Sequence, residues 1–417
     1  MTILHLISTF PPLTETFVLR EIRRLRKTGL NVIIGQLRPL HRTSPAKGFE
    51  DLSPLVNGAG WFSLEMLKSL AFFTLRKPRQ LAECLKIVLF SFGQPWHFVR
   101  MLYVLLSSMR LGYSLRSVPI EFVRADFLHT QALGARFLKS LLGVPYGITA
   151  YTVVVYYKLA IIEEIIREAA FLVADTWQTK GFLLSMGVSP NKVHLIRNGV
   201  SPEEFPPRHG PAADGSPVIL GVGSLISKKG FDVLLRACAI LRAREIQFRC
   251  VIIGDGAERE KLHNLKTVLG LDGCVEMLGY CSLAELKDWY YRAAMLVMPS
   301  VVSPRGETDG LPTVIIEALA SGLPVVGTET AAIPEIIQDG VNGFIVEPNA
   351  PEPLADRVQV LLERPDLREK FGCEGRRCVG QDFNLDRKIE ILRDLIVGHA
   401  PSESLSDIGH PFVQPAR

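Results

Sequence analysis

The chain lacks the cysteine pattern of a disulfide framework or a structural metal site. Its seven cysteines are scattered through 417 residues, with no C-x-x-C pair and no histidines at zinc-ligand spacing. It has no uninterrupted apolar run near the length of about 18 residues that a membrane-spanning helix needs. The start, Met1–Ser8, has no basic region typical of a signal peptide. These absences predict a cytoplasmic protein with reduced thiols, no bound metal and no cofactor.

A strong charge of either sign is also missing. The formal net charge is +4, a surplus too small to indicate nucleic acid as a partner. With 47% hydrophobic residues the chain is globular, and at roughly 100–200 residues per domain its length predicts two domains.

Short apolar runs alternate with amphipathic helical stretches, a pattern typical of parallel α/β sheets. The expected strands are Ile3–Ser8, Asn31–Gly35, Phe127–His129, Tyr146–Ala150, Phe171–Ala174, Val193–Ile196, Val218–Gly221, Phe248–Ile253, Val275–Leu278, Met295–Met298, Pro324–Gly327 and Gly343–Val346. The segment Ser201–Pro217, dense in proline and glycine, is the expected linker. The sequence therefore predicts two doubly wound α/β domains that face a ligand-binding cleft.

One segment, Trp61–Val118, interrupts the alternation with a helical, apolar and basic stretch. Its lysines and arginines are interleaved with Trp61, Phe72, Phe73, Phe90, Phe92, Trp96 and Phe98. This pattern is compatible with attachment to an anionic membrane surface, and equally with a helical insertion that buries its aromatic residues in the first domain.

The first candidate site is Gly221–Gly230, a glycine-rich loop between an expected strand and helix. Its glycines let the backbone approach a ligand, and Lys229 at its end could reach a phosphate. A tight turn with exposed lysines explains the same residues.

The second candidate site is more specific. Pro312 stands where a helix can begin, Asp309 lies just before it, and Glu317 lies inside it among apolar residues. A helix N-terminus favours an anion, and an acid in an apolar helix needs a partner such as ligand hydroxyl groups. The alternative is that Asp309 caps the helix and Glu317 faces solvent.

At these residues the chain resembles family 4 retaining glycosyltransferases of the GT-B fold. Lys229-Gly230 and the stretch Asp309–Val326 match the family's two main motifs. The stretch Phe10-Pro-Pro-Leu-Thr-Glu-Thr-Phe17 is similar to the opening of the exopolysaccharide branch, which includes colanic acid and amylovoran transferases.

The resemblance implies two Rossmann-like domains at 1–205 and 206–381, a helical insertion at about 61–118, a crossover helix at 382–400 that packs on the first domain, and a flexible tail at 401–417. It implies a nucleotide-diphosphate sugar as donor, with uridine as the default base ahead of guanosine. The acceptor would be a glycan or lipid-linked saccharide. The predicted location is cytoplasmic, and the membrane alternative for Trp61–Val118 adds peripheral attachment to the inner face of the plasma membrane.

The resemblance also assigns roles to individual residues. Lys229 would pair with the diphosphate without a metal, Glu317 with the ribose hydroxyls and Asp309 with the sugar hydroxyls. The catalytic set is Lys229, Asp309, Glu317 and Tyr151; the donor-binding set is Gly223, Ser224, Gly254, Gly279, Glu307, Gly310, Leu311, Pro312 and Thr313; the acceptor side has Thr14, Glu15 and His129.

Three departures from the family pattern bear on activity. Ser224 stands where the family has an arginine, Asp309 stands for the commoner glutamate, and Tyr151 replaces a histidine near the transferred sugar. His129 is what is left of an expected H-x-H pair, and a structural role explains it as well. An active retaining transferase is the leading hypothesis; a non-catalytic GT-B nucleotide-sugar-binding or scaffold protein is the alternative, and a sugar-nucleotide epimerase the third.

Overall fold

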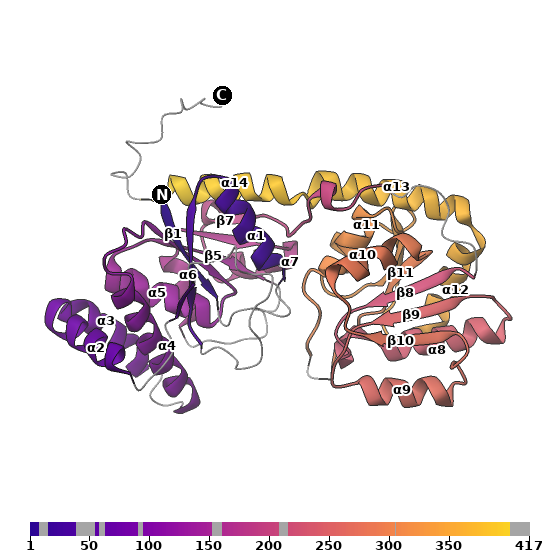
Figure 1. Ribbon diagram of the computed structural model, residues 1–417, viewed down its shortest axis with the longest axis horizontal. Coiled ribbons are helices and arrows are strands. Elements are labelled where there is room, and N and C mark those ends of the chain that lie inside the picture. Colours follow the sequence, from indigo (N-terminus) through magenta and orange to yellow (C-terminus); the bar gives the residue numbers. More distant parts are fainter. Residues whose placement is uncertain are drawn as a thin grey trace, which may run out of the picture. The chain divides into compact units, whose positions relative to one another are not determined.

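The protein forms two compact units in a computed structural model that describes residues 1–7, 16–38, 55–57, 63–90, 95–151, 161–207, 216–304 and 306–400. The first unit takes its residues from Met1–Ala174, Lys180–His194 and Ile389–Arg417, and the second from Asp175–Thr179 and Leu195–Lys388. Figure 1 labels their elements. The predicted domain bounds at 205, 381 and 400 stay predictions, and the predicted tail at 401–417 lies outside the described residues.

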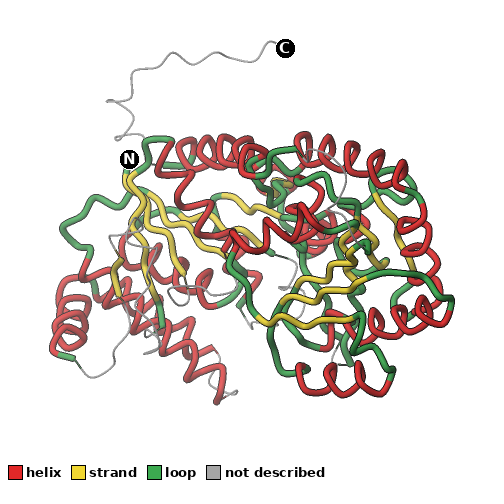
Figure 2. Tube along the Cα trace, turned by 45° about the vertical axis from the view of Figure 1, so that its right-hand side comes forward, coloured by secondary structure: helices red, strands yellow, loops and turns green. Residues whose placement is uncertain are grey.

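The first unit is built on a sheet whose strand order is β3-β2-β1-β4-β5-β6-β7. Strand β1 pairs in parallel with β2 and β4, and β5 does so with β4 and β6. Figure 2 shows these strands among helices. The strands are β1 (Thr2–Ile7), β2 (Asn31–Gln36), β3 (Leu55–Asn57), β4 (Phe122–Asp126), β5 (Tyr146–Ala150), β6 (Phe171–Ala174) and β7 (Val193–Leu195). The helices are α1 (Thr16–Lys27), α2 (Leu64–Arg76), α3 (Pro78–Phe90), α4 (Pro95–Ser114), α5 (Thr130–Leu142), α6 (Ile162–Glu168), α7 (Trp177–Ser185) and the 3-10 turn η3 (Pro190–Lys192).

The predicted strand at Phe127–His129 is wrong. The strand there is β4, which ends at Asp126, and Phe127 turns the chain with a φ of 66° before α5 begins. A positive φ is rare for a bulky residue, so the surrounding packing must hold this turn. The apolar residues that suggested a strand therefore form the turn that follows one.

A buried charge network joins β1, β4 and α1. Arg124 Nη2 lies 2.7 Å from Glu21 Oε1 and 3.3 Å from Asp126 Oδ1, and His5 Nε2 lies 2.6 Å from Asp126 Oδ2. All four side chains are almost fully buried. Because His5 and Arg124 are register partners on β1 and β4, their side chains share one face of the sheet. Burial of the Glu21 and Asp126 carboxylates is tolerable because the Arg124 guanidinium contacts both of them.

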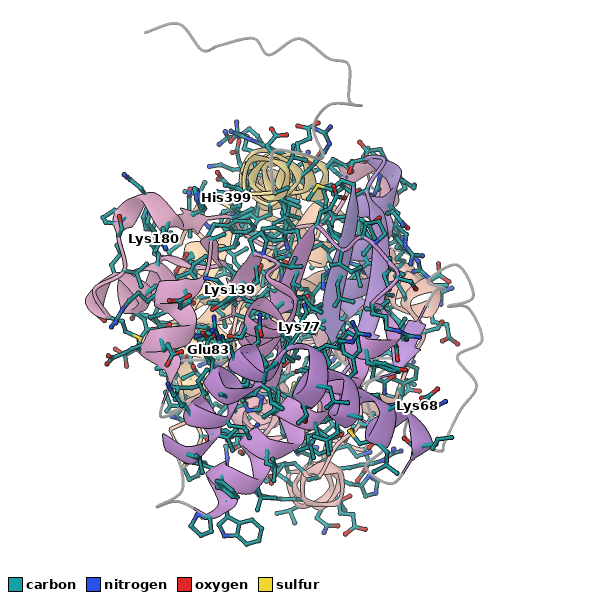
Figure 3. The ribbon with its side chains drawn as sticks, turned by 90° about the vertical axis from the view of Figure 1, so that its left-hand side faces the viewer. Lys68, Lys77, Glu83, Lys139, Lys180 and His399 are labelled. Atoms are coloured by element: carbon teal, nitrogen blue, oxygen red, sulfur yellow. The ribbon has the colours of Figure 1, made fainter. Side chains whose placement is uncertain are left out.

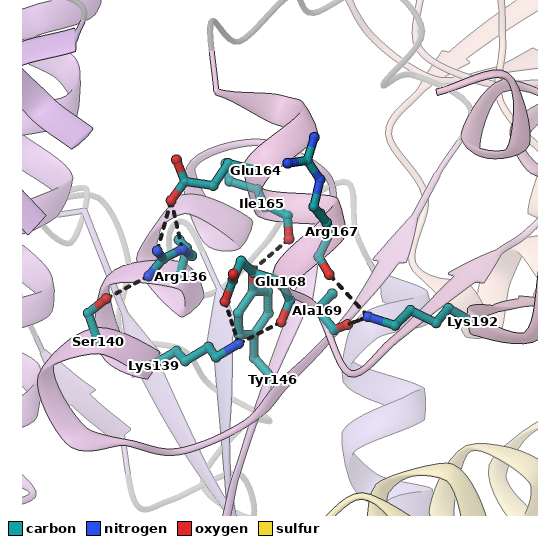
Figure 4. Close-up of polar contacts among 10 residues, drawn as sticks. All are labelled: Arg136, Lys139, Ser140, Tyr146, Glu164, Ile165, Arg167, Glu168, Ala169 and Lys192. Atoms are coloured by element: carbon teal, nitrogen blue, oxygen red, sulfur yellow. Dashed lines mark hydrogen bonds and ion pairs between the residues drawn. The ribbon is translucent and has the colours of Figure 1, made fainter. Parts of the chain in front are cut away.

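The end of α6 is held by two lysines that bind its last carbonyl groups. Lys139 Nζ, from α5, lies 2.6 Å from Glu168 Oε2 and also donates to the Glu168 carbonyl oxygen. Lys192 Nζ donates to the carbonyl oxygens of Arg167 and Ala169. Cations at a helix C-terminus satisfy groups that the helix cannot pair itself. Figure 4 shows how these contacts tie α5, α6 and η3 together beside β5.

The predicted helical insertion consists of α2, α3 and α4. Phe73 is fully buried and its ring meets that of Phe72 edge-on, so this part of the aromatic set belongs to the core of the first unit. Trp96 is exposed, whereas Trp61 and Phe92 lie outside the described residues. None of the helices in the described ranges is both long and apolar enough to cross a bilayer.

The second unit is built on a parallel sheet with strand order β10-β9-β8-β11-β12-β13. Ile219 on β8 packs with α8 and α12, whereas the next residue, Leu220, packs with α10 and α11, so helices cover both faces. The strands are β8 (Val218–Val222), β9 (Arg249–Ile253), β10 (Val275–Gly279), β11 (Met295–Met298), β12 (Val325–Thr328) and β13 (Gly343–Val346). The helices are α8 (Phe231–Ala243), α9 (Arg259–Val268), α10 (Leu283–Arg292), α11 (Thr313–Ala320), α12 (Pro351–Glu363), α13 (Pro365–Asp382) and α14 (Leu385–Gly398), with 3-10 turns η4 (Pro202–Glu204), η5 (Ser227–Lys229) and η6 (Ile333–Glu335).

The chain returns to the first unit through α14. Its first residues belong to the second unit, where Lys388 Nζ donates to Asn198 Oδ1 at 2.6 Å in a buried contact. Residues from Ile389 onward belong to the first unit, and the ring of His399 lies 5.4 Å from that of Phe171 on β6.

Candidate functional site

The candidate site lies where the strand order of the second unit reverses. Strands β8 and β11 are neighbours, and the chain leaves β8 toward β9 on one side and β11 toward β12 on the other. Loops that follow such a pair diverge and leave room for a ligand at the carboxyl ends of the strands. The loop after β8 carries Lys229, and the loop after β11 carries Asp309.

Two glycines bring the loop after β8 into close backbone contact with the segments that follow β9 and β11. Gly230 has a φ of 65°, and a Cβ there would lie 1.9 Å from the Pro299 carbonyl oxygen at the end of β11. A Cβ at Gly254, after β9, would lie 1.8 Å from the Gly223 carbonyl oxygen. No other residue type fits at either position without a backbone shift. These glycines therefore hold neighbouring loops close together, and whether Gly254 also binds the donor stays a prediction.

Lys229 and Asp309 form an ion pair at this edge of the sheet. Lys229 Nζ lies 2.8 Å from Asp309 Oδ2, and Ser300 Oγ donates to the same oxygen at 2.8 Å. Lys228 Nζ lies 3.7 Å from Asp309 Oδ1 and donates to the Thr308 carbonyl oxygen. The Asp309 side chain is only 6% exposed and that of Lys229 is 15% exposed. The two residues were predicted to bind different parts of the donor, the diphosphate and the sugar, and in the structure they contact each other.

Helix α11 begins four residues after Asp309 and carries a buried internal acid, Glu317. Pro312 is its N-cap, and the first N–H groups of a helix have no acceptor within it. Glu317 is 4% exposed, so the alternative in which it faces solvent is wrong. Tyr290 Oη, from α10, donates to Glu317 Oε2 at 3.0 Å. Sequence reasoning missed Tyr290, because no spacing along the chain relates α10 to α11.

The other residues predicted to bind the donor lie on the same loops with different exposure. Ser224 is exposed after β8, and Glu307 is exposed in a turn where Ser303 Oγ accepts from its N–H. Gly279 closes β10 and its carbonyl oxygen accepts from the Gly254 N–H at 2.8 Å. Leu311 and Pro312 are buried, whereas Gly310 and Thr313 are half-buried. Whether any of them touches a donor stays a prediction.

The predicted acceptor-side residues belong to the first unit. Tyr151 directly follows β5, is 4% exposed, and packs its ring against Phe17 at 5.0 Å and Phe127 at 4.8 Å. Its hydroxyl oxygen is buried in this structure. Thr14 and Glu15 lie outside the described residues.

His129 is the N-cap residue of α5 and lies against Arg100 of α4. Arg100 Nη2 contacts both ring nitrogens, the closer being Nε2, and the Thr130 hydroxyl lies 3.0 Å from Nδ1. Burial, together with the positive charges of Arg100 and Arg38, lowers the pKa of His129 to about 4. The ring is therefore neutral near pH 7. Arg100 is a further residue that sequence reasoning did not single out.

One cluster in the described residues has metal-ligand side chains, namely His5, Glu21 and Asp126. It is the buried network of the first unit, in which the Arg124 guanidinium contacts both carboxylates. Because a cation already fills this place, the residues do not fit a metal ion.

Comparison with known proteins finds a family match within the second unit. The family model for glycosyl transferases group 1 matches residues 203–377. A putative colanic acid biosynthesis glycosyltransferase of Salmonella typhimurium is 34% identical over 214 residues, which cover 51% of this chain and 52% of that protein. An amylovoran biosynthesis glycosyltransferase of Erwinia amylovora is 33% identical over 198 residues, 48% of this chain and 47% of that protein. The chain thus matches about half the length of these curated relatives.

Solved structures extend the likeness of fold to nearly the whole chain. Sucrose-phosphate synthase from Thermosynechococcus elongatus has a TM-score of 0.73 at 18% identity, covering 95% of this chain and 100% of that one. HepE from Anabaena, solved with UDP-glucose, has a TM-score of 0.69 at 16% identity with the same coverage. The chain therefore has the GT-B fold, its residues 203–377 match the model for glycosyl transferases group 1, and it is similar over about half its length to glycosyltransferases of exopolysaccharide biosynthesis.

Proposed function

We propose that the protein is a retaining glycosyltransferase of exopolysaccharide biosynthesis, which moves a sugar from a nucleotide diphosphate to a glycan or lipid-linked saccharide. The observation that carries the proposal is the Lys229–Asp309 pair at the reversal of strand order, beside the N-terminus of α11. A cation and a helix N-terminus converge there, as a departing diphosphate requires.

Each polar group of the site has a place on such a donor. Lys229 exchanges its Asp309 partner for the diphosphate, and the α11 N–H groups add to the same stabilisation without a metal. Asp309, released from Lys229, accepts from the sugar hydroxyls. Glu317, held by Tyr290, accepts from the ribose hydroxyls. UDP is the proposed nucleotide, and the UDP-bound structures of HepE support this choice over GDP.

The transfer breaks the bond between the anomeric carbon and the diphosphate oxygen. The acceptor hydroxyl oxygen bonds to the same face of that carbon, and its proton passes to the departing phosphate oxygen. The protein then has to supply orientation and charge stabilisation, and these match the residue types present. On the acceptor side we propose that Tyr151 takes the place of the family's histidine, with Thr14, Glu15 and His129 nearby.

We propose that this reaction takes place at the cytoplasmic face of the plasma membrane, with an anionic lipid surface as a partner. A lipid-linked acceptor would be presented there. The basic charge of the insertion supports this location, because Glu65 and Glu83 are the acids of 63–90 and 95–118 against eight lysines and arginines.

The test is a donor panel of UDP- and GDP-sugars incubated with the full chain, with and without membrane lipid extract, and analysed by mass spectrometry. We expect one donor to lose its nucleotide slowly alone and faster with acceptor, and Lys229→Ala to lose both activities. The matched control is Lys266→Ala, because Lys266 also forms an ion pair, with Asp272 on the surface of the same unit. Wild-type protein that binds nucleotide yet neither hydrolyses nor transfers any donor would overturn the proposal.

A further inference from the structure

The helical insertion of the first unit exposes a row of leucines. Leu64, Leu67 and Leu75 on α2 are 67%, 65% and 80% exposed, and Leu85 and Leu89 on α3 are 40% and 58% exposed. We call these five residues the leucine surface. On α2 their spacing of three and eight residues places them on one side of the helix, and the spacing of four does the same on α3.

These leucines are not needed for the core of the first unit. Other residues of the two helices supply that core, with Met66 and Phe73 of α2 and Cys84, Ile87 and Val88 of α3 all buried. A helix that fills the core with some of its apolar residues and exposes others has apolar surface available for a second contact. Exposed leucines at regular helical spacing on two consecutive helices therefore indicate a second contact surface.

Cations flank the leucine surface. Lys68 lies beside Leu67 and Arg76 beside Leu75, while Arg79 and Lys86 are exposed on α3. Figure 3 looks onto this end of the first unit, with labels on Lys68 of α2, on Lys77 directly after that helix, and on Glu83 of α3.

The acids in this region do not cancel that charge. Glu65 is paired with Arg110 at 2.6 Å, which leaves Glu83 as the acid of α2 and α3 without an ion pair among the described residues. The surface therefore combines large apolar side chains with a surplus of exposed positive charge. An anionic bilayer offers both complements, an apolar interior for the leucines and headgroup phosphates for the cations.

We infer that the leucine surface of α2 and α3 lies in the interface of an anionic membrane and holds the protein there. The inference deepens the location proposed above, but it does not depend on the transfer reaction, because lipid binding and transfer are measured separately. If two copies of this chain associated through this surface, the four cations of one copy would face those of the other. Repulsion between these like charges disfavours such a dimer.

The test is flotation of the full chain with vesicles of phosphatidylcholine alone and of phosphatidylcholine with phosphatidylglycerol. Wild-type protein is expected to bind only the anionic vesicles, and less as salt is added. The double variant Leu67→Gln/Leu75→Gln should lower the partition coefficient at least tenfold. Lys68→Gln/Lys86→Gln should lower it about fivefold for each lysine, the equivalent of about 1 kcal/mol per charge near the surface.

The matched controls are Val268→Gln and Lys370→Gln, exposed positions on α9 and α13 of the second unit. They should leave binding unchanged. All these side chains are exposed, so the variants should fold, and unchanged thermal unfolding verifies this. Equal binding to both vesicle types, no binding by the wild type, or no effect of the leucine variants would overturn the inference. So would a dimer, found by sedimentation, that the leucine substitutions dissociate.

Discussion

Replacing Asp309 with asparagine should tighten the binding of UDP, although it removes a residue of the site. In the structure Lys229 Nζ lies 2.8 Å from Asp309 Oδ2, and both side chains are largely buried. The diphosphate must therefore compete with a carboxylate that already neutralises the ammonium. Asparagine keeps the shape and the acceptor for Ser300 but removes the negative charge.

The size of the effect follows from the same geometry. Two unit charges about 4 Å apart interact by about 4 kcal/mol at an effective dielectric constant near 20. Solvation of the released carboxylate and the second cation, Lys228, offset part of this. We expect a net gain of about 1–2 kcal/mol, which is roughly five- to thirtyfold in affinity. Lys229→Ala should have the opposite sign and weaken UDP binding by about ten- to a hundredfold, because a charge-assisted contact is lost.

The assay is isothermal titration of UDP into each variant at low ionic strength, with thermal unfolding to verify the fold. Lys266 and Asp272 form the control pair, since their ion pair of 3.0 Å lies at α9 in the same unit. Lys266→Ala and Asp272→Asn should leave the affinity unchanged. If Asp309→Asn weakened UDP binding as Lys229→Ala does, the competition between carboxylate and diphosphate would be refuted.

Three further outcomes are expected. Glu317→Gln should weaken UDP binding by about three- to tenfold, which is less than the effect of Lys229→Ala. Tyr290→Phe should also weaken it, because each substitution removes part of one buried contact. Wild-type affinity for UDP in both variants, measured by titration, would contradict this. Tyr151→Phe should lower turnover and leave UDP affinity unchanged, since the ring still packs while the hydroxyl is lost; unchanged turnover would remove Tyr151 from the acceptor side. The pKa of His129 near 4 lies below the ordinary value, so the unfolded chain takes up a proton that the folded chain does not, and stability should fall as pH decreases from about 6.5 to 4. After allowance for solvent this is roughly 1–2 kcal/mol, and urea unfolding of His129→Gln should show a flatter pH dependence than the wild type.

The strands were predictable where the core is apolar and not where it is charged. Met295–Met298 and Gly343–Val346 coincide with β11 and β13, because their residues are apolar and both faces of the sheet are covered. Strand β4 was missed, since Arg124 and Asp126 interrupt its apolar pattern. Only their partners on β1 and α1, far away in the sequence, make those charges compatible with a buried strand.

The site was predictable as a list of residues but not as a set of contacts. The spacing from Asp309 to Glu317 shows which helix carries the acid, because helical geometry is local. The ion pair with Lys229 joins the ends of two different strands, and the hydrogen bond from Tyr290 joins two helices. Neither pairing leaves a trace in the sequence. In the insertion, likewise, the apolar pattern of α2 could not tell buried Phe73 from exposed Leu75.

The buried network consists of His5, Glu21, Arg124 and Asp126, which come from distant parts of the sequence. Because they contact one another, the effect of substituting one of them depends on the other three. Loss of Arg124 leaves two carboxylates in the interior without their cation, at a cost of about 3–5 kcal/mol, which is much of the stability of a typical domain. Joint replacement by apolar residues of similar volume is nearly neutral by comparison. The effects of substitutions there are therefore strongly non-additive. Related chains should keep the whole set or lose it together, and an engineer who wishes to remove one charge must remove its partners in the same step.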